Sequence, residues 1–234
     1  GSGLVGSEMC IRDSLYLLGD AILFLCFLIF VLYLFTFAVN SKRKPLYTYP
    51  IAKKKYRFAV LFPAYKEDIV ILDSVNSFLQ QEYPKELYDI IVISNQMTSQ
   101  TVEDLKKLPI KVVELDSLKC TKIEALQKAI EYIEKGNLKY DNIVILDADN
   151  IVDPTYLSKI NDALYAGCSV LQTHRVAKNR DSSVAVLDSI SEEINNSIFR
   201  KGHTRLGFSS ALSGSGMAFE YDLFKETIEG YSGI

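Results

Sequence analysis

Two acidic residues, Asp147 and Asp149, stand one residue apart, directly after the apolar run 142–146. Carboxylates with this spacing can reach one divalent cation, and Mg²⁺ or Mn²⁺ prefers carboxylate and phosphate oxygens while keeping several waters. A cation held there would bridge a diphosphate and neutralise a leaving group. The pair could instead form an acidic turn before the helix that opens near Asp153 and Pro154. A D-x-D pattern alone leaves both interpretations open.

Two other positions carry side chains suited to a nucleotide. Tyr65 could stack on a nucleobase, and Glu67 could accept hydrogen bonds from a ribose or base. Alternatively, Glu67 and Asp68 favour the N-terminus of the next helix through its dipole. Lys122, at the start of another predicted helix, could hold a phosphate together with the helix amides, or could be a solvated lysine.

These residues lie between segments that alternate between strand and helix patterns. Apolar runs predict strands at 58–63, 89–94, 110–115, 142–146, 168–173 and 217–220. Helical spacing of apolar residues predicts helices at 69–81, 101–107, 121–135, 154–165 and 183–199, with Gly136 as a C-cap. Strands that are apolar throughout and separated by helices indicate an α/β domain with a mainly parallel sheet. Ligands of such sheets bind at the carboxyl ends of the strands, where the polar residues above are found.

The motifs occur in a recognisable order. They are LFPAYKED, Lys122 before EALQKAIEYI, VILDADN, Gln172-Thr173-His174 and Gly214-Ser215-Gly216. In this order they resemble family-2 glycosyltransferases, and most closely the membrane-bound branch that includes cellulose and hyaluronan synthases. The resemblance covers residues 57–224.

This resemblance implies a GT-A fold, a nucleoside-diphosphate-sugar donor (commonly a UDP-sugar), Mg²⁺ or Mn²⁺ as cofactor, and inversion at the anomeric carbon. The acceptor would be a glycan or a lipid-linked acceptor. It implies that Asp147 and Asp149 serve diphosphate and metal, with Asp149 the more direct ligand, and that Lys122 faces the diphosphate. The other implied positions are Pro63, Tyr65 and Glu67 around the nucleotide, and Gln172, Thr173, Gly214, Ser215 and Gly216 beside the sugar or acceptor.

The sequence departs from the family pattern in three places. The second strand of the family ends in an aspartate that binds the base, where this chain has Asn95, which can still hydrogen-bond a uracil edge. The family's catalytic base lies in an acidic motif beyond the glycine loop, and no such motif occurs before Ile234. The Q-x-x-R-W acceptor motif is impossible in a chain without tryptophan. We therefore expect a fragment that binds the donor without transferring the sugar.

Residues 21–39 are uncharged and long enough to cross the hydrocarbon core of a membrane, which needs about 20 apolar residues. We predict a transmembrane helix at 15–40; a buried core helix and a signal peptide are the alternatives. Basic residues follow the run, so the positive-inside rule places the next segment in the cytoplasm. The predicted organisation is a non-native segment at 1–14, a basic linker at 41–56 and an incomplete GT-A-like domain at 57–234.

Other classes fit less well. A net charge of −3 gives no argument for nucleic-acid binding, and four scattered cysteines with two histidines form no zinc motif. The chain has no glycine-rich dinucleotide fingerprint and no P-loop. In haloacid-dehalogenase-type phosphatases D-x-D follows the first strand, whereas here it follows the fourth. A non-catalytic, membrane-anchored nucleotide-sugar-binding or scaffold module remains the alternative to a transferase.

Overall fold

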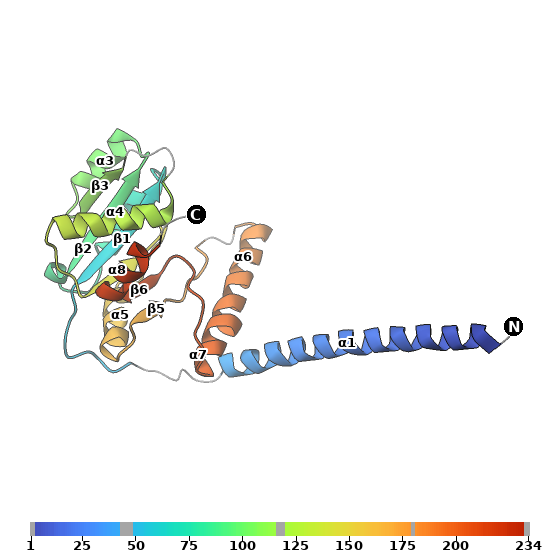
Figure 1. Cartoon of the computed structure of the whole chain (residues 1–234). Coiled ribbons are helices and arrows are strands. Elements are labelled where there is room, and N and C mark those ends of the chain that lie inside the picture. Colours follow the sequence, from blue (N-terminus) through green and yellow to red (C-terminus); the bar gives the residue numbers. More distant parts are fainter. Residues whose placement is uncertain (1–2, 43–48, 116–119, 179–180, 232–234) are drawn as a thin grey trace. The chain divides into compact units, whose positions relative to one another are not determined.

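The structure is a computed structural model that describes residues 3–42, 49–115, 120–178 and 181–231. The chain divides into two compact units (Figure 1). One unit comprises Gly1–Leu46 and Arg175–Ala211, and the other comprises Tyr47–His174 and Leu212–Ile234. Residues 175–211, which lie within the range predicted as one domain, cluster with the N-terminal helix.

The second unit is built on a six-stranded sheet with the order β3-β2-β1-β4-β6-β5. Its strands are β1 (Phe58–Tyr65), β2 (Tyr88–Asn95), β3 (Lys111–Leu115), β4 (Asn142–Ile145), β5 (Val170–Gln172) and β6 (Met217–Glu220). The first four strands run parallel, and β6 pairs antiparallel with β4 and β5. This arrangement confirms the predicted α/β class and the mainly parallel sheet.

Helices cover both faces of this sheet. They are α2 (Ile71–Phe78), η1 (Lys85–Leu87), α3 (Ser99–Lys106), α4 (Lys122–Lys135), α5 (Tyr156–Tyr165) and α8 (Tyr221–Glu229). The predicted helix at 69–81 is shorter at both ends, and the predicted helix at 154–165 begins only at Tyr156. Its start differs because Asp153 binds the Thr155 amide in a turn before the helix.

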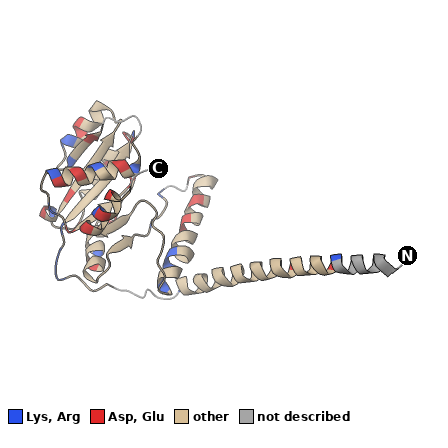
Figure 2. Ribbon diagram, viewed as in Figure 1, with Lys and Arg blue, Asp and Glu red and all other residues tan. Residues whose placement is uncertain are grey.

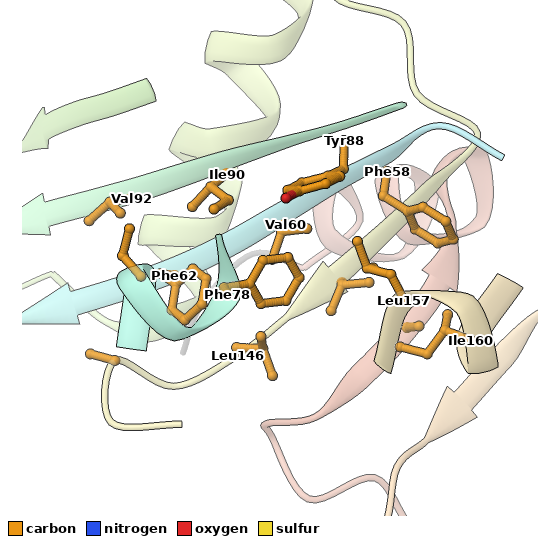
Figure 3. Packing of buried hydrophobic residues seen from close by; sticks show 14 of the residues in the cluster. Phe58, Val60, Phe62, Phe78, Tyr88, Ile90, Val92, Leu146, Leu157 and Ile160 are labelled. Atoms are coloured by element: carbon orange, nitrogen blue, oxygen red, sulfur yellow. The ribbon is translucent and has the colours of Figure 1, made fainter. Parts of the chain in front are cut away.

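Successive side chains of β1 point to opposite faces of the sheet, so this strand contributes to the core on both faces. Phe58, Val60 and Phe62 point to one face, where they pack with Phe78 of α2 and with Leu157 and Ile160 of α5 (Figure 3). Leu105 of α3 belongs to the same cluster. Ala59 and Leu61 point to the other face, against α4 and α8. Every residue in this run is fully buried, as expected for a central parallel strand whose two faces are both covered.

Pro63 lies inside β1, where a missing N–H would normally break a ladder. The Leu61 carbonyl accepts from the Leu146 N–H on the β4 side (3.0 Å). Backbone groups alternate between the two sides of a strand, so the nitrogen of Pro63, two residues later, also faces the β4 side. Pairing of β1 with β4 has ended at Ile145. The proline ring therefore occupies a side of β1 that needs no hydrogen-bond donor.

The second half of the predicted linker is packed onto α5. The Ala52 N–H donates to Asp162 Oδ1 (2.8 Å), and the Tyr56 N–H donates to Asn161 Oδ1 (2.8 Å). Asn161 in turn donates to the Lys54 carbonyl (3.0 Å). Residues 43–48 of the linker lie outside the described residues.

The first unit is helical, with α1 (Gly3–Ser41), α6 (Ser183–Ile194), η2 (Asn195–Gly202) and α7 (His203–Arg205). Helix α1 already begins at Gly3, so it includes most of the segment predicted as non-native; residues 1–2 are outside the described residues. Within it, Arg12–Ser41 is long and apolar enough to cross a membrane, and its most apolar 18-residue window has a mean hydropathy of 2.9. The helix predicted at 183–199 changes to π-helical geometry after Ile194.

The C-terminal end of α1 packs on η2 and α7. The His203 ring stacks on Phe37 with centroids 3.9 Å apart, and His203 Nε2 lies 2.7 Å from the Tyr33 hydroxyl. A side chain at Gly202 would meet the Phe37 carbonyl at 2.6 Å, so only glycine allows this approach. The contact fixes α1 within its unit.

An ionic cluster lies at the amino end of the sheet. The Asp89 carboxylate accepts from Lys111 Nζ and from the Tyr140 hydroxyl (2.7 Å), and Arg57 lies 3.7 Å away. Burial raises the pKa of Asp89, but the hydrogen bonds from Lys111 and Tyr140 outweigh it and leave the pKa below the ordinary value of 3.8. The cluster therefore stabilises the fold while Asp89 is ionised.

We expect Asp89→Asn to lower stability at neutral pH by about 2 kcal/mol, or about 4–8 °C in Tm for a chain of this size. A lowered folded-state pKa contributes stability above the unfolded-state value, and that contribution is lost as pH falls through the folded-state value. The difference between the variant and the unmodified protein should therefore shrink in acid. Thermal unfolding by circular dichroism in detergent, from pH 7 down to about 3, measures this. Glu103→Gln, at an exposed position of α3, is the control, and a pH-independent difference at Asp89 would contradict the assignment.

Candidate functional site

The candidate site lies at the carboxyl edge of the sheet, within the second unit. Because β1, β2 and β4 are parallel neighbours, their carboxyl ends meet at one edge. Tyr65 at the end of β1 is in register with Asn95 at the end of β2, and Asp147 follows β4. The fold thus brings together the predicted positions from three separate strand ends.

Lys122 links three segments at this edge. Its ammonium group contacts the Asp147 carboxylate and donates to the Gly214 carbonyl (2.7 Å). The lysine is the first residue of α4, whose N-terminus is fixed by a capping box between Thr121 and Glu124. The Lys122 and Asp147 side chains are each 38% exposed, so the pair is accessible to a ligand.

A buried serine holds the D-x-D turn in place. The Asp147 N–H donates to Ser215 Oγ (2.8 Å), and the Ser215 hydroxyl donates to Asn150 Oδ1. Asn150 Oδ1 also accepts from the Asp147 N–H at 3.2 Å. Asn150 was not singled out in the sequence, although a polar residue directly after D-A-D was a usable signal. Ser215 is fully buried, so its role here is to position the turn.

Gln172 and Thr173 hold the glycine loop from β5. Gln172 Nε2 donates to the Ser215 carbonyl (2.9 Å), and Gln172 Oε1 accepts from the Ser213 N–H (2.8 Å). The Thr173 hydroxyl donates to the Gly216 carbonyl at 2.8 Å. Both side chains therefore bind loop backbone. The resemblance had implied that they border a sugar or acceptor, and the structure adds this positioning contact.

Glycine is required at two positions of this loop. Gly214 has φ 81° and Gly216 has φ 65°, both in the left-handed region that side chains disfavour. The Gly214 carbonyl reaches Lys122 from this conformation, and the Gly216 N–H returns to β4 by donating to the Ile145 carbonyl (2.9 Å). The loop is a defined turn.

The ends of β1 and β2 share an unusual backbone. Lys66 (φ 56°) and Gln96 (φ 54°) directly follow the paired residues Tyr65 and Asn95, and both adopt left-handed conformations without being glycine. The Tyr65 hydroxyl donates to Gln96 Oε1 at 3.3 Å. Such conformations cost about 1–3 kcal/mol each and concentrate at ligand-binding sites.

Asn95 is 97% buried at this edge, being 3% exposed, and has unpaired polar atoms. Neither its Oδ1 nor its Nδ2 has a hydrogen-bond partner in the described part of the chain. Unpaired buried amides are rare and need an explanation.

The two acids after Tyr65 differ in their surroundings. Glu67 is exposed, as a ligand-binding residue can be. Asp68 was considered as a favourable group for the following helix, but its carboxylate instead accepts from the Thr98 amide and hydroxyl, both at 2.8 Å. Hydrogen bonds from Thr101 and Thr98 hold the pKa of Asp68 below its usual value. Asp68 therefore ties the β1 end to the loop after β2.

The carboxylates of Asp147 and Asp149 fit a cation that takes most of its ligands from a substrate and from water. Asp149 is exposed, and its Oδ1 accepts only from Asn150 Nδ2 (3.1 Å) among the contacts of the described residues, while Asp147 already contacts Lys122. Within the described ranges, no group of three His, Cys, Asp or Glu side chains could hold a metal. Mg²⁺ commonly uses one or two carboxylates plus substrate phosphates and water, which this site could accommodate.

A mainly parallel sheet covered by helices, with acids, a lysine and a glycine loop at its carboxyl edge, defines an α/β protein of the GT-A type. Residues 56–230 match the glycosyltransferase-like family 2, and the chain belongs to this family. No curated protein sequence matches the chain.

Solved structures with a similar fold include a mannosyltransferase and a fragment of S. aureus TarS. The mannosyltransferase PcManGT from Pyrobaculum calidifontis, solved with GDP-Man and Mn²⁺, has a TM-score of 0.64 at 17% identity, over 84% of this chain and 53% of that one. S. aureus TarS 1–349 with UDP has a TM-score of 0.56 at 19% identity, over 73% and 48%. The chain thus spans about half the length of each, and the likeness shows the fold.

We expect Gln172→Leu to loosen the glycine loop, because it leaves the Ser213 N–H and the Ser215 carbonyl without their partner. Losing such bonds costs about 1–3 kcal/mol each. Hydrogen–deuterium exchange should become at least several-fold faster at residues 213–216. Gln127→Leu is a matched control, since the Gln127 amide binds the Ile228 and Tyr231 carbonyls instead. Equal exchange of the loop in both variants would show that Gln172 does not hold it.

Proposed function

We propose that this protein binds a nucleoside-diphosphate sugar at the carboxyl edge of its sheet, as the donor-binding part of an inverting glycosyltransferase. The observation that carries the proposal is the contact of Lys122 with both Asp147 and Gly214 at the capped N-terminus of α4. A lysine and free helix amides bind phosphate, and paired carboxylates bind the cation that accompanies it. The GDP-Man and UDP held by the two similar structures support this ligand class.

Each group has a distinct role in this proposal. Lys122 and the first amides of α4 bind the diphosphate. The diphosphate gains negative charge as it leaves the sugar, and the positive charge of these groups stabilises it. Asp149, with Asp147, would hold Mg²⁺ or Mn²⁺, which when bound supplies further charge neutralisation at the leaving group. Gln172, Thr173 and Ser215 keep the glycine loop beside that position. We assign no residue of this chain as the base that takes the acceptor proton.

Transfer of a hexose to a glycan or lipid-linked acceptor, and membership of the cellulose- and hyaluronan-synthase-like branch, belong to the same proposal. A non-catalytic nucleotide-sugar-binding module is the second candidate, favoured by Asn95 at a position where the family has an acid. Titration of UDP-sugars with and without Mn²⁺ separates them. Metal-dependent binding that Asp149→Asn abolishes supports the transferase, whereas binding of no nucleotide sugar favours a scaffold module.

We expect a UDP-sugar to bind the full-length protein more tightly in the presence of Mn²⁺. Asp149→Asn removes one charge from the cation ligands, so the gain from Mn²⁺ should fall at least about tenfold. Calorimetric titration in detergent measures both affinities. Asp153→Asn is the control, because Asp153 is an exposed acid nearby that binds the Thr155 backbone. Equal loss in both variants, or Mn²⁺-independent binding, would contradict a metal role for Asp149.

We further propose that the first unit anchors the protein in a membrane. Helix α1 has a long uncharged stretch (Figure 2), and 6% of its most apolar window is buried. Exposed apolar side chains continue on α6 in the same unit, including Val184, Leu187 and Ile190. Lys42 and the exposed lysines at 53–55 follow α1, so the positive-inside rule places the sheet unit in the cytoplasm.

We expect the protein to stay with membranes after alkaline carbonate extraction and to keep an N-terminal tag. Lysines in place of Leu28 and Leu32 should release it, because each costs about 3 kcal/mol at the centre of a span. Lysines in place of Leu15 and Leu18, near the predicted start of the span, are the control and should release much less. Extraction of the unmodified protein, or loss of the tag, would indicate a peripheral or a secreted protein.

A further inference from the structure

We infer that Asn95 lets this site accept uridine and cytidine nucleotides alike, because its buried amide has no hydrogen-bond partner among the described residues that fixes which way it points. The inference rests on the proposed nucleotide site and adds a base preference to it. It concerns the particular side chain found at the end of β2.

The evidence is the contrast between two equally buried asparagines. Asn161 is also 3% exposed, but its Oδ1 accepts from the Tyr56 N–H and the Tyr83 hydroxyl, and its Nδ2 donates to the Lys54 carbonyl. Those partners fix which way its amide points. Asn95 has no partner on either atom within the described residues, so none of these residues favours one amide orientation over the other.

The position of Asn95 suits a nucleobase. Neighbouring strands are about 4.8 Å apart, and β1 separates β2 from β4, so the end of β2 lies roughly 10 Å from the Lys122–Asp147 pair. That separation leaves room for a ribose between the diphosphate and the base. Tyr65, 48% exposed, stands at the end of the intervening strand, where its ring can contact the nucleoside.

The chemistry of the two bases then determines the preference. Uracil presents N3–H as a donor beside the O4 acceptor, whereas cytosine presents N3 as an acceptor beside the N4 amino donor. An amide satisfies both patterns by turning over, since it has one donor side and one acceptor side. An ionised carboxylate only accepts, so an aspartate at this position would pair with uracil N3–H and repel cytosine N3.

The test compares UDP and CDP binding to the full-length protein with Mn²⁺ at pH 8, where an aspartate at position 95 is ionised. We expect the unmodified protein to bind the two within about threefold, and Asn95→Asp to favour UDP by at least about tenfold, the scale of one base-pairing mismatch. Asp153→Asn, an acid-to-amide change at an exposed position outside the proposed base contact, should leave the UDP-to-CDP ratio unchanged. UDP methylated at N3 tests the same contact on the unmodified protein and should bind at least about tenfold more weakly than UDP.

The outcomes separate this inference from the function on which it rests. A UDP preference of tenfold or more in the unmodified protein, an unchanged ratio in Asn95→Asp, or full binding of methylated UDP would each overturn the role of Asn95. Those results would leave nucleotide binding itself intact. If neither UDP nor CDP binds, the proposed nucleotide site fails, and this inference fails with it.

Discussion

The contact between Lys122 and Asp147 brings together the segments on which the whole site depends. The pair is more than a third exposed on each side, and exposed ion pairs contribute only about 0–1 kcal/mol. Its importance is therefore positional. Through the Gly214 carbonyl, the same ammonium group joins the start of α4, the turn after β4 and the glycine loop.

The parallel sheet makes that contact possible. The carboxyl ends of the four parallel strands lie at one edge of the sheet. The antiparallel β6 begins at the same edge, so the glycine loop before it lies beside β4. The fully buried Ser215 and the partly buried Gln172 then hold the turns through their hydrogen bonds. Among the described residues, Asn95 is a buried residue at this edge whose side-chain amide has no partner on either atom. A fold in which the loops have their hydrogen-bond partners, while one buried amide has none, is organised to bind a ligand at that amide.

Much of this arrangement could be predicted from the sequence because it depends on local patterns. Uninterrupted apolar runs identified the strands, and their alternation with helices indicated the parallel sheet and its functional edge. The contacts of Gln172 and Thr173 could not be predicted, because they join β5 to a loop some 40 residues later in the chain. The position of Asn150 directly after D-A-D was a usable signal, but its contact with Ser215, 65 residues later, could not be predicted. The grouping of 175–211 with α1 depends on packing at Phe37 and Gly202, which no local pattern shows.

A structure of the full-length protein with UDP and Mn²⁺ tests the central claim most directly. The account predicts a diphosphate beside Lys122 and the first amides of α4, the cation at Asp149, and the base against Asn95. A nucleotide bound elsewhere on the protein, or carboxylates of Asp147 and Asp149 that face separate surroundings with no ligand between them, would contradict it.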